Sequence, residues 1–343
     1  MMSRTKRVVS IDSRIGGGGD IWMRLSGFYT LAGLNPEIEI HLLIPEFMRA
    51  IAKHVYGDRL IISDVESKNQ MTYTVLGIRH LMKGLMAGNR YISPYQLAVI
   101  HDKKKRETKD AVNKLIFKCA DFLGLIQVPP LKYMTLYQGF LEVIALKKFR
   151  STSYDSFKQQ MNKDADGLKL KLNNQLPISA ELLIPEDLKA NVIIFPTGTS
   201  RQFVPLKWAI ENMPKAYYSF FHKDESLKDF EAAGLKTIPF YKEPGDIIEL
   251  SKNAAWTITT DSFPSHLLQS FTNNCAVTIT EVLESRIISP VFTGVVIQAT
   301  APCHPCLHLD RKTHKLCSAG FEECINWQSA DYTHAIIASI SHK

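Results

Sequence analysis

No hydrophobic run in the sequence approaches the roughly 18 consecutive apolar residues that suggest a membrane-spanning helix. The basic N-terminal stretch has one apolar segment, Val8 to Ile11, which is too short for the core of a signal peptide. From the sequence we therefore expect no membrane span and a cytoplasmic protein.

Two further absences reduce the range of functions that we expect. No aromatic residues are interleaved with the basic ones, and no nucleic-acid-binding motif is present, so we expect no nucleic-acid partner. The chain also has no short-period repeat and no low-complexity tract. The net charge of +7 is mild, and the densest basic run is Lys103 to Arg106. This run is either a solvated surface or a region that attracts an anionic acceptor or a membrane surface.

What the chain does have is enough length for two domains, since 343 residues exceed the usual size of a single core. Its hydrophobic (45%) and charged (22%) fractions are ordinary for a globular protein. We divide it into residues 1–174, residues 175–325 and a helical tail, residues 326–343. The polar stretch Ser151 to Asn174 shows little apolar periodicity, so the first boundary is placed at its end.

Apolar runs and helical spacing alternate in the first half, which predicts a doubly wound parallel sheet. The predicted strands are Arg7–Asp12, Ile38–Leu43, Leu60–Ile62 and Gln96–Asp102. The predicted helices are Asp20–Leu31, Pro45–Val55, Glu107–Leu125 and Leu131–Lys148.

The second half repeats this α/β plan. Its predicted strands are Asn191–Phe195, Ala216–Phe221, Thr237–Pro239, Trp256–Thr260 and Val291–Gln298. Its predicted helices are Lys207–Met213, Leu227–Ala233, Asp246–Lys252 and a closing helix, Tyr332–Ile340. Two similar halves, each with loops that follow strands, suggest a cleft with one reactant on each wall.

Four contiguous glycines, Gly16 to Gly19, follow the first strand and precede Asp20. This spacing is not the Gly-x-Gly-x-x-Gly of a dinucleotide site, and a carboxylate at the helix N-terminus would repel a pyrophosphate. Asp20 is either a helix N-cap or a catalytic base that faces the cleft.

Pro196 to Arg201 follows a strand in the second half and contains Gly198, Thr199 and Ser200 before the cation Arg201. Small residues and an arginine at such a loop can hold phosphate, although an exposed loop with an ordinary arginine is the alternative. Glu225, past the next strand, is either a ribose ligand or a surface or capping glutamate.

Asp261 and Ser262 follow the apolar run Trp256 to Thr260 and precede a predicted helix. A helix N-terminus carries unpaired N–H groups and a partial positive charge, so this turn is expected to form an anion pocket. His266 would lie in the first turn of the helix and face the pocket.

Two of the six cysteines, Cys119 and Cys275, fall in regular patterns and are expected to be buried thiols. The other four are clustered: Cys303, Cys306, Cys317 and Cys324. Clustered thiols with a Cys-x-x-Cys pair in a cytoplasmic chain favour a metal knuckle over disulfides, with four unrelated thiols as the alternative. Three histidines between them are possible substitute ligands: His304, His308 and His314.

Several of these motifs resemble glycosyltransferase family nine, the ADP-heptose heptosyltransferases. Gly19-Asp20 is similar to the Gly-Asp of that family, and Phe195 to Ser200 is similar to its donor-phosphate loop. Tyr95 to Asp102 resembles its acidic-ended central strand, and Asp261 to Leu267 resembles its Asp-Ser-Gly-Pro-x-His-Leu signature. The Cys-x-Pro-Cys at Cys303 to Cys306 is also seen in members of the family.

The resemblance implies a GT-B fold, with two Rossmann-like domains that face each other. It further implies an inverting transfer from a nucleotide sugar, ADP-heptose being favoured, with Asp20 as the base and no catalytic divalent ion. Thr199, Ser200 and Arg201 would hold the diphosphate, and Asp261, Ser262 and His266 would line the donor pocket. The acceptor stays open between a lipopolysaccharide core, a protein hydroxyl and a small natural product.

The sequence departs from the family pattern at two donor-side positions. Phe263 replaces the glycine of the signature, and Gln202 to Pro205 lacks the usual phosphate lysine, for which Arg201 or Lys207 is a possible substitute. A protein of the same fold that binds sugar nucleotides without turnover is therefore one alternative. A Rossmann-type oxidoreductase is another, although its glycine fingerprint is not evident.

The cysteine cluster generates a direct test. We predict one structural metal, zinc or iron, on Cys303, Cys306, Cys317 and Cys324, because four thiolates leave no open coordination position. It would brace the second domain or a contact in a homo-oligomer. Elemental analysis of protein purified without chelator should find about one equivalent of metal per chain. Near-absence of both zinc and iron would show that the cysteines are not a metal site.

Overall fold

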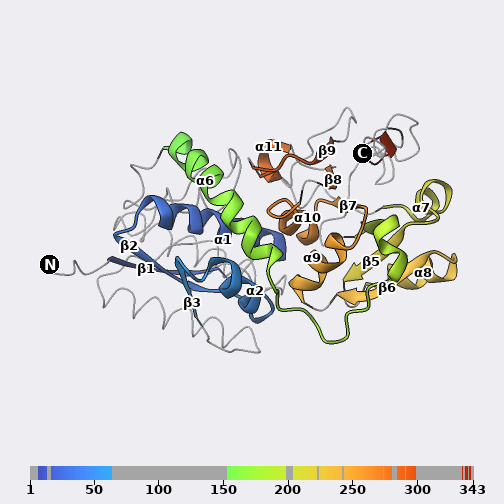
Figure 1. The fold of residues 1–343 in the computed structure, drawn as a ribbon, viewed down its shortest axis with the longest axis horizontal. Coiled ribbons are helices and arrows are strands. Elements are labelled where there is room, and N and C mark those ends of the chain that lie inside the picture. Colours follow the sequence, from blue (N-terminus) through green and yellow to red (C-terminus); the bar gives the residue numbers. More distant parts are fainter. Residues whose placement is uncertain are drawn as a thin grey trace, which may run out of the picture. The chain divides into compact units, whose positions relative to one another are not determined.

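The computed structural model describes residues 7–13, 17–63, 153–197, 204–221, 224–241, 243–272, 274–279, 284–289 and 291–298, with a few positions between 334 and 340. The chain forms two compact units, Met1–Gly167 and Leu168–Lys343. Each is α/β in character (Figure 1), and each is described by itself. Within these residues no helix combines the length and apolar character that crossing a membrane requires.

The first unit is built on three parallel strands in the order β1-β2-β3. The strands are β1 (Arg7–Asp12), β2 (Ile38–Leu43) and β3 (Leu60–Ile62), and the helices between them are α1 (Gly18–Leu34) and α2 (Glu46–Tyr56). The predicted β-α-β-α-β order of this segment is confirmed. Ile40 and Leu42 on β2 are fully buried, as expected for a strand covered by helices.

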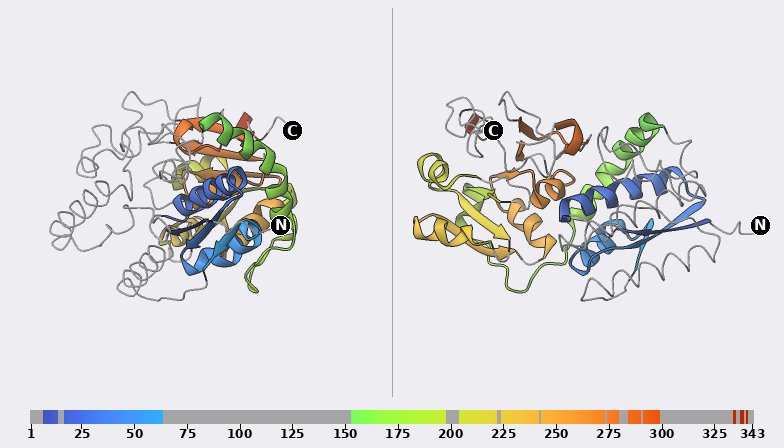
Figure 2. Two further views of the ribbon diagram at one scale, coloured as in Figure 1. Left: turned by 90° about the vertical axis from the view of Figure 1, so that its left-hand side faces the viewer. Right: turned by 180° about the vertical axis from the view of Figure 1, so that it is seen from behind.

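Helix α1 is buried around nearly its whole circumference, because apolar residues occupy several of its faces. It runs alongside the strands of the first sheet (Figure 2). Trp22 and Tyr29 on α1 both pack against Tyr56 at the end of α2, with ring centroids 5.1 and 5.4 Å apart. These aromatic contacts fix α1 against α2.

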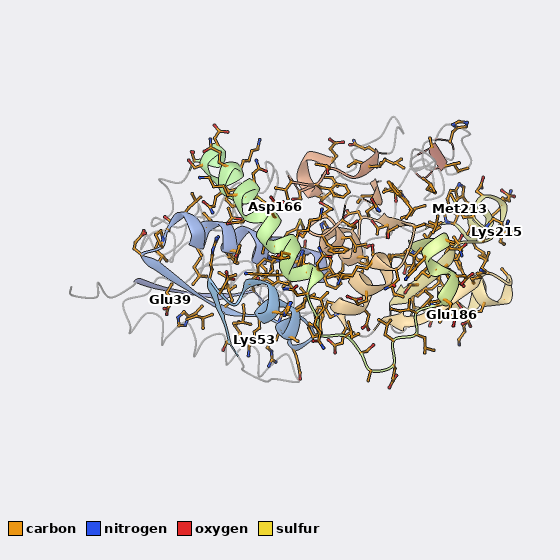
Figure 3. All side chains as sticks on the ribbon, viewed as in Figure 1. Glu39, Lys53, Asp166, Glu186, Met213 and Lys215 are labelled. Atoms are coloured by element: carbon orange, nitrogen blue, oxygen red, sulfur yellow. The ribbon has the colours of Figure 1, made fainter. Side chains whose placement is uncertain are left out.

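Helix α6 (Tyr154–Asn173) contradicts the sequence analysis, which found little periodicity in this polar stretch. Its buried positions follow a helical spacing of three or four residues: Phe157, Met161, Asp164, Leu168 and Leu172. These buried positions were not recognised as a helical stripe in the sequence because the central one is an aspartate. Charged residues such as Asp166 occupy the exposed side of the helix (Figure 3).

Asp164 is buried because it is paired. Its carboxylate accepts hydrogen bonds from Arg59 (2.8 Å) and from Gln160 (3.0 Å). The Arg59 guanidinium also lies over the Tyr29 ring, 4.3 Å from its centroid. Together these contacts fasten the first half of α6 to α1 and to the turn before β3.

The second unit contains six parallel strands in the order β6-β5-β4-β7-β8-β9. The strands are β4 (Val192–Phe195), β5 (Tyr217–Phe221), β6 (Lys236–Tyr241), β7 (Trp256–Thr260), β8 (Cys275–Ile279) and β9 (Val295–Gln298). The helices are α7 (Leu206–Asn212), α8 (Ser226–Ala232), α9 (Pro244–Lys252), α10 (Phe263–Leu268) and α11 (Glu284–Ile287), preceded by the 3-10 helix η3 (Glu186–Ala190).

The two faces of this sheet are covered by different helices (Figure 1). Trp208 of α7 and Phe230 of α8 belong to the core on one face, with Ile194, Tyr218 and Ile258 from the strands. On the other face, Ser251 of α9 hydrogen-bonds Thr257 of β7. The sheet is therefore doubly wound, as the alternation of elements predicted.

Most predicted strands and helices of this half are found within a few residues of their expected bounds. The last strand is shorter than predicted because the chain turns at Phe292, whose N–H donates to the Ser289 carbonyl, and β9 begins only at Val295. The predicted buried thiol at Cys275 is confirmed, and burial raises its pKa to about 12. Cys119 and the closing helix lie wholly or largely outside the described residues, as do the strand and helices predicted between 96 and 148.

The segment after α6 is fastened to the start of α9. Asp246, fully buried, accepts hydrogen bonds from the Ser179 N–H (2.8 Å), the Ser179 hydroxyl (2.7 Å) and the Glu243 N–H (3.0 Å). Gly245 allows the close approach that these bonds need, because a Cβ there would lie 2.1 Å from the Pro177 carbonyl oxygen. Burial, and secondly the charge of Asp246, raise the pKa of Glu243.

Gly245→Ala should therefore lower the free energy of unfolding by about 1–3 kcal/mol, the usual cost of forcing extra volume into a packed site. Gly167→Ala is the matched control: it lies in α6 with no atom within 4 Å of the added Cβ, and should stabilise by about 0.5–1 kcal/mol. Urea unfolding followed by circular dichroism measures both. Equal stabilisation by the two substitutions would contradict the close contact at Pro177.

Candidate functional site

The strand order of the second unit reverses between β4 and β7, which lie side by side in the middle of the sheet. They pair in parallel from Val192 opposite Trp256 to Phe195 opposite Thr259. The chain leaves β4 toward α7 on one face and leaves β7 toward α10 on the other. In open α/β sheets, ligands bind at the carboxyl ends of the strands at such a reversal.

Both loops that the sequence singled out in this half begin at this reversal. Pro196 and Thr197 follow β4, and Asp261 and Ser262 follow β7. The structure therefore brings the starts of the two loops together, although they are more than 60 residues apart in the chain. Thr199, Ser200 and Arg201, the rest of the predicted phosphate loop, lie outside the described residues.

Strand β7 is a rigid support for its loop, because all five of its residues are buried. The Thr278 hydroxyl of β8 donates to the Thr259 carbonyl (3.1 Å), and the Thr257 and Ser251 hydroxyls are 2.8 Å apart. Thr260, the last residue of the strand, is fully buried, and within the described part of the chain its hydroxyl has no hydrogen-bond partner.

The turn between β7 and α10 is held by its serines. Ser262 is the N-cap of α10; its hydroxyl donates to the Thr260 carbonyl (3.1 Å), and its N–H donates to the Ser265 hydroxyl (3.3 Å). Ser265 in turn donates to the Ser262 carbonyl (2.8 Å). Ser265 was not singled out from the sequence, because it occupies the N3 position at which a capping box usually has Glu or Gln.

Helix α10 has six residues, and its second residue is Pro264, which has no N–H to offer a ligand. Fewer peptide dipoles and fewer N–H groups are therefore available here than a full helix N-terminus would supply. Side chains must provide much of any anion-binding capacity at this turn. Phe263, which stands where the resembled signature has glycine, is half-buried.

Asp261 and His266 form a buried pair. The Asp261 Oδ1 and His266 Nε2 atoms are 3.2 Å apart, and the two side chains are 10% and 7% exposed. Nε2 is therefore the ring nitrogen that faces the carboxylate. The other ring nitrogen, Nδ1, is buried, and no described residue forms a hydrogen bond with it.

Gln269, three residues after His266, was not singled out from the sequence. Its Oε1 accepts a hydrogen bond from the Ser289 N–H (2.7 Å), which joins the end of α10 to the segment before β9. Ser289 itself is buried. No local pattern identifies this contact, because its partners are 20 residues apart.

Two further candidates sit at helix starts. Asp20 is the third residue of α1, half-buried, and its Oδ2 accepts a hydrogen bond from the Gly17 N–H (3.1 Å). The N-cap itself is Gly17, so Asp20 is the acidic half of a capping contact. Glu225 is the exposed N-cap residue of α8, and it follows β5, the neighbour of β4.

The described residues contain no group of three or more histidine, cysteine or acidic side chains placed to hold a metal. The predicted knuckle, Cys303 to Cys324, lies outside them, so the metal remains a prediction. Asp20 belongs to the first unit, and the Asp261–His266 pair belongs to the second.

No protein-family model matches the sequence, and no curated protein matches it at a significant level. Similarity is found among solved structures. Two heptosyltransferases from E. coli are similar at low scores: ADP-heptose lps heptosyltransferase II (TM-score 0.49, 12% identity, 85% of this chain and 90% of that one) and WaaC with ADP (TM-score 0.44, 11% identity, 85% and 93%). At these scores they carry no argument here.

A glycosyl transferase of family 9 from Veillonella parvula matches along its length. The likeness covers 100% of this chain and 99% of that one, with a TM-score of 0.57 and 13% sequence identity. Identity this low is evidence for the fold alone. The α/β class with parallel sheets, predicted from the sequence, is confirmed, and the chain has the fold of a family 9 glycosyltransferase.

Proposed function

We propose that this protein is an inverting glycosyltransferase that moves a sugar from a nucleotide-sugar donor to an acceptor hydroxyl. The observation that carries the proposal is the buried Asp261–His266 pair at the strand-order reversal of the second unit, in a chain with the family 9 fold. ADP-heptose is the donor to test first, because the sequence motifs resemble those of heptosyltransferases. The acceptor, a glycan or a protein, is not specified by these residues.

In this proposal the second unit binds the donor. The diphosphate would lie at the carboxyl ends of β4 and β7, where Ser262 and His266 of the turn and of α10 would contact it, and Thr199, Ser200 and Arg201 are proposed to hold it from the other side. An arginine can hold two phosphate oxygens at once, which suits Arg201 to this role. Glu225, beyond β5, would accept hydrogen bonds from ribose hydroxyls.

Asp20 would act as the base. As the acceptor oxygen attacks the anomeric carbon, its proton passes to the Asp20 carboxylate, and the bond to the nucleoside diphosphate breaks on the opposite face. A single displacement of this kind inverts the anomeric centre. Positively charged groups around the departing diphosphate would stabilise the transition state.

A second candidate function is sugar-nucleotide binding without turnover. One observation favours it: the Asp20 carboxylate already accepts a hydrogen bond from the Gly17 N–H, which is a sufficient structural role for an acidic residue at this position. Phe263 adds bulk where the resembled signature has glycine. The base and capping roles are separable by substitution.

Asp20→Asn should leave the fold and donor binding intact and lower the transfer rate at least about a hundredfold, the usual size of a general-base contribution. Asparagine keeps an oxygen that can accept from Gly17, so the cap survives while the base is lost. Asp20→Ala is the matched variant that loses both. Sugar transfer and thermal stability should be measured for all three proteins. Normal transfer by Asp20→Asn would assign Asp20 to capping alone.

Arg201→Ala and His266→Ala should each weaken donor binding about tenfold or more, since hydrogen bonds to charged groups contribute about 1.5–3 kcal/mol. Thermal shifts with ADP-, UDP-, GDP- and TDP-sugars provide the measurement, because a ligand at about 100 times its Kd adds roughly 2.7 kcal/mol. Nicotinamide dinucleotides belong in the same screen as a test of the oxidoreductase alternative. If the wild type binds a sugar nucleotide and both variants bind it equally well, the donor does not lie at this reversal.

A further inference from the structure

Two buried polar atoms beside Asp261, the Thr260 hydroxyl and His266 Nδ1, have no hydrogen-bond partner among the residues that the structure describes. Thr260 is fully buried and His266 is 8% exposed. A buried polar group without a partner is costly, and most such groups in folded proteins are paired. Two of them within seven residues, at the strand-order reversal, indicate a place where a ligand completes the hydrogen bonding.

The ring nitrogens of His266 have different roles. Nε2 is committed to the Asp261 carboxylate at 3.2 Å, so Nδ1 is the atom left for a ligand. When the ring is neutral and Nε2 carries the proton, Nδ1 is an acceptor and cannot bond to a phosphate oxygen. When the ring is an imidazolium, both nitrogens carry a proton, and Nδ1 can donate to a phosphate oxygen while Nε2 stays paired with Asp261.

Charge also favours the imidazolium form of His266. A neutral ring would leave Asp261 as a net negative charge at the turn, which repels a diphosphate. With the imidazolium, the pair is neutral overall and directs an N–H toward the ligand. Among the described residues, the Asp261 carboxylate is the charged group that forms an ion pair with the ring. Histidine in general is largely neutral above neutral pH, so forming the imidazolium there takes a proton from the solvent.

We propose that His266 meets the donor diphosphate through Nδ1 as an imidazolium whose charge Asp261 balances, so that donor binding takes up one proton. The inference rests on the proposed function, because it requires a sugar nucleotide at this site. Asp261 then acts as a positioning residue: it orients the ring and stabilises its charged form.

The test is the pH dependence of binding, measured by calorimetry from about pH 6 to about pH 8.5, across the range in which histidine loses its charge. The probes are ADP-glucose, UDP-glucose, GDP-mannose and TDP-glucose, taken in turn, whose diphosphate diesters do not titrate in this range. At the upper end, affinity should fall by up to about tenfold per pH unit, the linkage expected for uptake of one proton. Repeating the titration at one pH in two buffers of different ionisation enthalpy counts that proton directly.

Two variants with side chains that do not titrate separate the ring nitrogens. His266→Asn places an amide near the position of Nδ1, and His266→Gln places one near Nε2. Both should abolish the proton uptake, and Asn should retain more affinity at high pH because its amide can reach the phosphate. Asp261→Asn should leave the ring present but reduce the uptake, because the counter-charge is gone.

The outcomes distinguish the inference from the function on which it rests. If neither ADP-heptose nor any of these four sugar nucleotides binds the wild type, the proposed function and the inference both fail. Binding that is independent of pH, or proton uptake that persists in His266→Asn and His266→Gln, overturns the inference alone and leaves the donor site in place.

Discussion

The pairing of β4 with β7 is the constraint on which the rest of the second unit depends. Every crossover on one side of this pair places its helix on one face of the sheet, and the crossovers on the other side place theirs on the opposite face. At the carboxyl ends of β4 and β7, the chain therefore leaves two neighbouring strands toward opposite faces of the sheet. The Asp261–His266 pair lies there because Asp261 directly follows β7, a strand that is buried along its entire length.

Much of this arrangement was predictable from local sequence. The bounds of β2, β3 and β7 agree with those predicted, because β-branched and other apolar residues are concentrated in these segments. That Asp261 and Ser262 end a strand and precede a helix was predicted for the same reason. Helix α6 was not predicted, since Asp164 interrupts its apolar stripe and is stable there only through Arg59, more than 100 residues away in the chain.

The detailed contacts of the candidate site could not be predicted from local sequence patterns. The sequence placed Asp261 before a helix and His266 in its first turn, but their contact depends on side-chain rotamers, and the lack of a partner for Nδ1 among the described residues depends on everything that packs around the ring. The join between Gln269 and Ser289 depends on how two separate loops meet. Such contacts arise from tertiary packing, which periodicity and spacing do not encode.

Helix α6 also bears on how the chain can be divided. It is continuous from Tyr154 to Asn173, and the division between the two compact units falls inside it, after Gly167. A gene fragment that stops at this division would break the helix two turns before its end and separate Leu168 and Leu172 from the rest of the buried stripe. Because Asp164 ties the helix to the first unit and Ser179 ties the following segment to the second, a cut between Asn174 and Pro177 preserves both attachments and is the natural place to separate the halves.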